Sequence, residues 1–130
     1  MSRELSNQAV NVTLTTTSEI ACVTSPVPDS QYPVGGGISV NGVVTAVCGG
    51  TTSALTVRVR QGSGTTGSIV GSASVISAGA TPGLDVSVPV SVIDYAPAFP
   101  PGVYTITAQQ ASATGNGTVN YAKVTAAYPG

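Results

Sequence analysis

The chain has 130 residues, which suits one domain, and its formal net charge of −1 arises from four basic and five acidic side chains. So few scattered charges give no basic patch for nucleic acid, and no apolar run reaches the length of a membrane helix, so we expect neither partner. Hydrophobic residues make up 42% of the chain and charged residues 7%. We therefore expect a folded chain with a Ser- and Thr-rich surface, and assembly to cover that surface.

The N-terminal residues 1–8 lack the apolar core of a secretory signal, so we expect the chain to be made and kept in a cytoplasm. We predict two parts. Residues 1–18 form an N-terminal arm or a first strand, and residues 19–130 form the folded domain.

Alternating apolar and polar residues, interrupted by Gly, Pro and Asn, predict a series of short strands. In chain order these are residues 10–14, 19–24, 38–48, 55–60, 69–76, 84–92, 103–110 and 118–128.

Three local signals refine these strands. Asn41-Gly42 interrupts one strand as a bulge, which we favour, or as a tight turn. Pro89 points outward and cannot donate to a neighbour, which places its strand at an edge or at a bulge. Asn116-Gly117 predicts a hairpin between the last two strands.

Eight strands without a helix predict an all-β antiparallel sandwich, and we favour a jelly roll over an immunoglobulin-like sandwich. The chain has no Trp for an immunoglobulin core, and its cysteines, Cys22 and Cys48, both lie in early strands. Their spacing leaves two alternatives open. They pack as small buried side chains, which we favour, or they form one disulfide.

The sequence predicts no enzyme, no cofactor and no metal site. It contains no His and a single lysine, Lys123, so a nucleophilic Ser or Thr has no ordinary base. The carboxylates are isolated, which argues against calcium. For Asp85 and Asp94 we expect a solvated surface or the cap of a turn, and not the pair of a glycosidase.

Candidate binding residues are therefore those suited to interfaces. Arg58 and Arg60 share one strand face and are candidates to meet carboxylates of a neighbouring subunit or of a capsid. The alternative is that they only protect a strand from edge pairing. Aromatic anchors bury large areas at low entropy cost. The candidates are Tyr32, Tyr95, Phe99, Tyr104, Tyr121 and Tyr128, although Tyr104 and Tyr121 equally suit the core or a sheet surface.

Residues 53–67, a strand followed by a glycine-rich turn, resemble the tumour-necrosis-factor-like jelly rolls of bacteriophage virions. Residues 101–110, followed by Asn116-Gly117 and a closing strand, carry the same resemblance, which extends over about residues 19–128. The resemblance consists of strand and turn patterns and includes no invariant motif.

The resemblance implies a homotrimer and a place in the virion, assembled in the host cytoplasm. The small size favours a capsid decoration protein that binds the lattice of the major capsid protein. The alternative is the tip of a tail or head fibre that binds a receptor or a host-surface glycan. A bacterial surface or spore-coat module is a further alternative.

Overall fold

The computed structural model describes residues 2–28, 37–49, 54–76, 85–97, 102–111 and 115–129. The regular structure in these ranges is antiparallel β-strand, as predicted, and no helix in them could span a membrane. The strands are β1 Ser2–Ala9, β2 Val12–Leu14, β3 Ile20–Thr24, β4 Ile38–Val47, β5 Ala54–Gln61, β6 Ile69–Ile76, β7 Asp85–Asp94, β8 Tyr104–Ala111 and β9 Gly117–Pro129.

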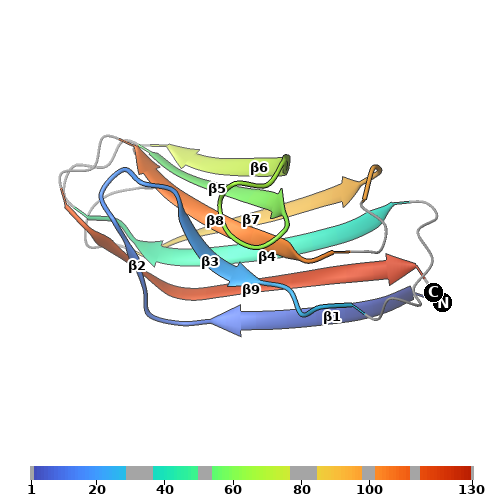
Figure 1. Ribbon diagram of the computed structural model, residues 1–130. Coiled ribbons are helices and arrows are strands. Elements are labelled where there is room, and N and C mark those ends of the chain that lie inside the picture. The colour runs from blue at the N-terminus through green and yellow to red at the C-terminus, as the bar shows by residue number, and fades with distance from the viewer. Residues whose placement is uncertain are drawn as a thin grey trace.

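The strands form two sheets that pack face to face (Figure 1). Sheet A has the order β1-β9-β4-β7, with β2 also paired to β9, and sheet B has the order β3-β8-β5-β6. Apart from β1 to β2 and β5 to β6, each strand lies in the other sheet from its predecessor. This is the strand order of a jelly roll, in which two Greek keys interleave.

The described chain has nine strands, so the predicted count of eight is wrong by one. The additional strand is β1, in residues 1–18. β1 and β2 pair with successive parts of β9, from Ser2 opposite Pro129 to Leu14 opposite Gly117. Between them Asn11 has a φ of 56°, a left-handed conformation that Asn tolerates better than most residues. This residue divides what would otherwise be one long strand.

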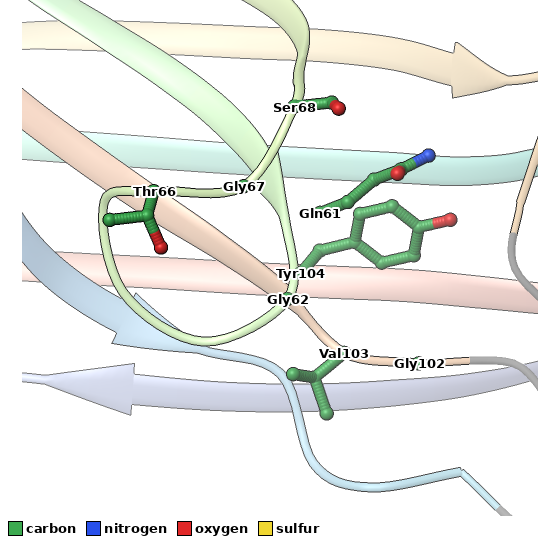
Figure 2. A pocket seen from close by; sticks show the side chains of 8 residues that line it. All are labelled: Gln61, Gly62, Thr66, Gly67, Ser68, Gly102, Val103 and Tyr104. Atoms are coloured by element: carbon green, nitrogen blue, oxygen red, sulfur yellow. The ribbon is translucent and has the colours of Figure 1, made fainter.

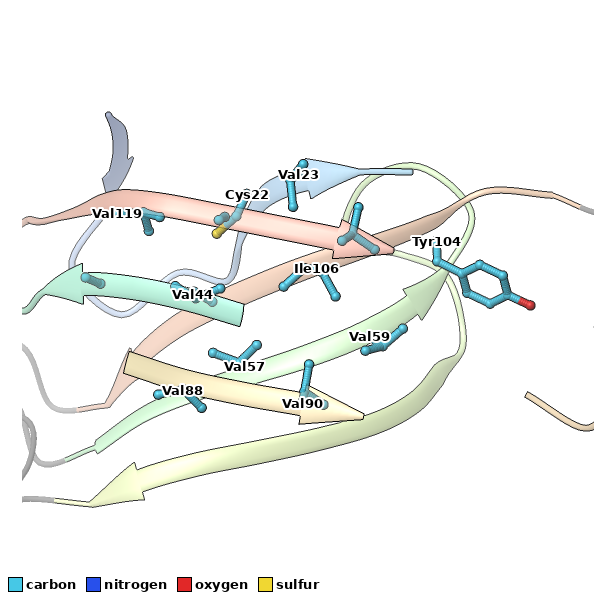
Figure 3. Close-up of a cluster of buried hydrophobic side chains, with 14 of the residues drawn as sticks. Cys22, Val23, Val44, Val57, Val59, Val88, Val90, Tyr104, Ile106 and Val119 are labelled. Atoms are coloured by element: carbon cyan, nitrogen blue, oxygen red, sulfur yellow. The ribbon is translucent and has the colours of Figure 1, made fainter. Parts of the chain in front are cut away.

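Inward-facing Val, Ile and Leu side chains of both sheets form the core (Figure 3). In β7 the predicted alternation is confirmed, because Val86, Val88 and Val90 are buried while the residues between them are exposed. In β5 the buried side chains are Leu55, Val57 and Val59. Burying each such side chain contributes roughly 1.5–3 kcal/mol before conformational entropy is subtracted.

The predicted bulge at Asn41-Gly42 is wrong, because β4 keeps continuous register with both neighbours there. The irregularity between β4 and β9 lies instead at Thr45/Ala46. Gly42 points into the core, where a Cβ would lie 2.6 Å from Ile106 Cδ1. The glycine therefore makes room for the Ile106 side chain.

The prediction that Pro89 belongs to an edge strand is confirmed. β7 is the last strand of sheet A and Pro89 is exposed, opposite Val43 of β4.

The hairpin predicted at Asn116-Gly117 is wrong, because β8 lies in sheet B and β9 in sheet A. Asn116 and Gly117 instead contact other segments of the chain. Asn116 Oδ1 accepts a 3.1 Å hydrogen bond from the Thr16 backbone N–H. A Cβ on Gly117 would lie 2.5 Å from the Val47 carbonyl oxygen. Gly117 therefore lets the start of β9 approach the end of β4.

Cys22 and Cys48 are free thiols buried in the core, as the packing alternative predicts. Burial raises the pKa of Cys22 to about 12 and also raises the pKa of Cys48. A thiol with so high a pKa forms little thiolate, so both side chains act as small hydrophobic residues.

Candidate functional site

Glu19 lies directly before β3, and its side chain binds residues on the outer face of sheet B. Its carboxylate accepts two hydrogen bonds from Arg60, at 2.6 Å from Nε and 2.8 Å from Nη2. The Thr107 hydroxyl donates a third, at 2.6 Å. Such paired Arg–carboxylate bonds fix orientation as well as charge. The Arg60 bond is the main cause that lowers the pKa of Glu19 below its usual value.

Arg58 lies beside the same carboxylate. Its Nη1 is 3.6 Å from Glu19 Oε1 and donates a 2.7 Å hydrogen bond to Gln109 Oε1. Both arginines thus share an outward face, as predicted, and both have a partner within the chain. Their role at a subunit or capsid interface stays a prediction.

A second polar cluster surrounds Asp94 at the end of β7. One carboxylate oxygen accepts 2.7 Å hydrogen bonds from the Tyr104 hydroxyl and from Gln61 Nε2. The other accepts from the backbone N–H of Ala96 at 3.1 Å. Asp94 therefore caps a turn, as one alternative predicted, but it is only 4% exposed, so the solvated-surface alternative is wrong. Burial and the neighbouring Asp94 carboxylate raise the pKa of Tyr104.

A groove of about 430 Å³ opens next to this cluster, between the turn after β5 and the start of β8 (Figure 2). Figure 2 shows Gln61 and Tyr104 extending side by side toward the end of the sandwich, where both bind Asp94. The walls are mostly small or uncharged: Gln61, Gly62, Thr66, Gly67, Ser68, Gly102, Val103 and Tyr104. The groove therefore suits a neutral polar ligand better than an ionic one.

The outer face of sheet A forms a broad surface with few charges, which we call the neutral face. It comprises the outward residues of β4, β7 and β9 that stand opposite one another in the register. They are Ser39, Asn41, Val43, Thr45, Val47, Asp85, Ser87, Pro89, Ser91, Ile93, Thr118, Tyr121, Lys123, Thr125 and Ala127. Lys123 and Asp85, of opposite sign, are the two charged residues in this set. A shallow hollow of about 210 Å³ lies beside Lys123, next to Asn41 and Thr125.

The predicted aromatic anchors fall into three groups. Tyr95 is 79% exposed, and Tyr121 is half-buried with its hydroxyl 3.3 Å from Gln8 Oε1. Tyr104 and Tyr128 are buried in the core, and the Tyr128 hydroxyl donates to the Gly102 carbonyl at 2.7 Å. The burial of Tyr104 agrees with the core alternative that was left open for it, and an interface role for these residues stays a prediction. Tyr32 and Phe99 lie outside the described residues.

The sequence reasoning missed Glu19 and Gln61 as cluster members. A weak signal existed for Glu19, because a single acid beside a strand is a natural partner for two outward arginines. Gln61 carried no signal, since its partner Asp94 follows 33 residues later.

No protein-family model matches this chain, and no curated protein matches it in sequence. Solved structures do match in fold. The VP2 protein of infectious bursal disease virus, in a subviral particle, aligns with a TM-score of 0.63 and 13% identity, over 96% of this chain and 32% of VP2. A structure of the Gx strain of that virus gives a TM-score of 0.61 and 12% identity, over 100% of this chain and 33% of the other.

The vertex protein P5 of PRD1 aligns with a TM-score of 0.54 and 15% identity, over 99% of this chain and 96% of P5. The chain spans about a third of the length of the infectious bursal disease virus chains and nearly all of P5. At these identities the likeness concerns the fold alone. The chain shares a two-sheet β-sandwich with proteins of virus particles.

Proposed function

We propose that this chain is a virion structural protein, a bacteriophage capsid decoration protein that forms a homotrimer and binds the lattice of the major capsid protein. The observation that carries the proposal is the neutral face. A broad surface with two charges of opposite sign among fifteen outward residues offers little charge repulsion and is well suited to contact another subunit.

The sandwich fold supports this proposal, because solved structures with a similar fold include proteins of virus particles. Stabilisation of the shell would follow from mass action. A protein that binds only the assembled lattice lowers the free energy of that lattice relative to its dissociated subunits. Contact areas of standard size, roughly 1,200–2,000 Å² in total, suffice for specific binding.

The trimer is tested by light scattering on the purified chain. We expect a mass of three chains of 12.7 kDa, or of six where trimers pair with one another. Val43→Lys places a second positive charge beside Lys123 in the neutral face and should break the trimer, so that the mass is no longer a multiple of three chains. Ser63→Lys adds the same charge at an exposed position in the turn after β5 and should leave the trimer intact. A monomeric wild type would refute the trimer.

Binding to the shell is tested by cosedimentation with capsids that lack this protein. We expect the wild type to pellet with the capsids and to raise their melting temperature, and Ser63→Lys to behave in the same way. Failure of the wild-type trimer to pellet would refute the decoration role while leaving the trimer standing.

The alternative is the receptor- or glycan-binding tip of a tail or head fibre, and the groove beside Asp94 favours it. The walls of the groove are neutral and include hydroxyl groups. The exposed Tyr95 directly follows Asp94 in the sequence. Neutral hydroxyl groups and an exposed aromatic ring are features of sites that bind sugars. Under this alternative the protein would pellet with host cell walls and not with capsids. Ser68→Trp, which fills the groove from an exposed position, would abolish that binding.

A further inference from the structure

The two sheets have four edges in the described chain, one of them shared by β1 and the three-residue β2, and three of these edges have features that hinder pairing with another chain. β1 includes Arg3 and Glu4. β7 has Pro89 at its centre. β3 has five residues and a bulge between Ala21 and Val23. Charges, prolines, bulges and shortness are the usual devices that keep an edge from pairing.

The fourth edge, formed by β6, differs from these. Its eight residues, Ile69 to Ile76, include no charged residue and no proline. A register shift opposite Val59/Arg60 affects only its first residues, and from Gly71 onward it pairs regularly with β5. Within the described part of the chain, β5 is its one strand partner in sheet B. The far side of β6 therefore presents an extended, uncharged strand edge.

On the outer faces of both sheets, hydrogen bonds between hydroxyl groups connect neighbouring strands. Hydroxyl pairs link neighbouring strands at Ser6–Thr125 (2.9 Å), Thr24–Thr105 (2.9 Å), Thr45–Ser87 (3.2 Å) and Thr56–Ser74 (3.1 Å). Ser74 brings this pattern to β6, where Ser72 and Ser74 are both exposed on the outer face. Because a hydroxyl both donates and accepts, Ser74 can bond Thr56 and a further hydroxyl at the same time.

We propose that β6 is an interaction edge whose partner is the β6 strand of a second copy, paired antiparallel about a two-fold axis at Ala73. This register places Ser72 of each copy opposite Ser74 of the other, so that two hydroxyl pairs form and only a methyl group stands at the axis. Because the strand is neutral, two copies bring no like charges together, and sheet B continues from one copy into the next.

This pairing is independent of the proposed virion role. It turns monomers into dimers, and it turns trimers into hexamers when the three β6 edges of one trimer pair with those of a second trimer. The neutral face lies on sheet A and β6 on sheet B, so variants can separate the two contacts. A trimer that persists without doubling would overturn this inference and leave the trimer standing.

The first test compares masses by sedimentation. Ser72→Lys/Ser74→Lys places two positive charges per copy on the edge, and we expect half of the wild-type mass. Thr13→Lys is the matched control at an exposed position of β2, and we expect the wild-type mass. Thermal melting establishes that each variant is folded. Equal masses for the wild type and the double variant, or open-ended growth of the wild type, would overturn the pairing.

The second test examines the register by disulfide formation under mild oxidation. Residues directly opposite in antiparallel strands lie within disulfide reach. A mixture of Ser72→Cys and Ser74→Cys chains should form a mixed dimer faster than either variant alone forms its own. The buried Cys22 and Cys48 are common to all samples, so the wild type serves as the control. Absence of the mixed dimer, or a faster Ser72→Cys homodimer, would overturn the proposal.

Discussion

The Tyr104 hydroxyl donates a 2.7 Å hydrogen bond to Asp94 Oδ2, and this bond connects β8 of sheet B with β7 of sheet A. Gln61 of β5 donates to the same oxygen, so two strands of sheet B bind one carboxylate of sheet A. Hydrogen bonds to a buried charge are stronger than neutral ones, and leaving the charge underbonded is costly. We conclude that this cluster fixes the relative position of the sheets at one end of the sandwich.

Tyr104→Phe should therefore destabilise the fold. The variant keeps the ring but removes one donor from a carboxylate that is only 4% exposed. We expect a loss of about 1–3 kcal/mol in the free energy of unfolding, measured by urea denaturation. Tyr121→Phe is the control, because its half-buried hydroxyl makes a longer 3.3 Å contact with Gln8. Equal effects of the two variants would show that the Asp94 cluster contributes nothing particular.

The Glu19–Arg60 pair should make stability depend on pH. Because its pKa is lowered in the folded state, Glu19 binds protons more weakly there than in the unfolded chain. The stabilisation is fully present above the unfolded pKa, near 4.5, and is lost as the pH falls through the lower folded pKa. We expect Glu19→Gln to be less stable than the wild type at pH 7 and the difference to shrink at acidic pH. A difference that does not change with pH would contradict this assignment.

Gly71→Ala should force the edges of the two sheets apart. A Cβ at this position would lie 1.9 Å from Val92 Cγ1 and 3.0 Å from Val92 Cβ, on the neighbouring β7. Overpacking of this kind costs about 1–3 kcal/mol. The double variant Gly71→Ala/Val92→Ala should recover part of the loss, measured in a double-mutant cycle. Gly102→Ala has no atom within 4 Å of its new Cβ and serves as the control.

The two cysteines should resist thiol reagents in the native protein. Cys22 is 6% exposed and Cys48 is 2% exposed, and burial raises both pKa values. We expect negligible labelling at pH 8 until denaturant is added, after which two thiols react per chain. A reducing agent should leave the melting temperature unchanged. Rapid native labelling would contradict the buried, free state of these thiols.

The strongly alternating strands were predictable from the sequence because their pattern is local. Val86, Val88 and Val90 follow one another at every second position, and Pro89 between them marks an edge. For residues 1–18 the sequence left an arm and a first strand open as alternatives, because Leu5 and Ala9 are the only apolar residues in the sequence of β1. β1 is a strand because β9, more than a hundred residues later, pairs with its full length.

The candidate site was less predictable, because its residues come from distant parts of the sequence. The outward positions of Arg58 and Arg60 follow from strand periodicity, but their partner Glu19 comes from about forty residues earlier. Asn116-Gly117 resembles a hairpin turn locally, yet the assignment of β8 and β9 to different sheets depends on all the other strands. Local patterns indicate where a strand lies and which side faces the core, but not which strand stands beside it.

The central position of β9 limits when this protein can fold during its synthesis. β9 supplies the lateral partner of β1, of β2 and of one side of β4, and it ends at Pro129. Until the ribosome has made β9, β1 and β2 have no neighbour to hydrogen-bond, so sheet A can close only after residues 117–129 have been added. A nascent chain stalled before residue 117 should be digested readily by protease, whereas the released chain should resist it.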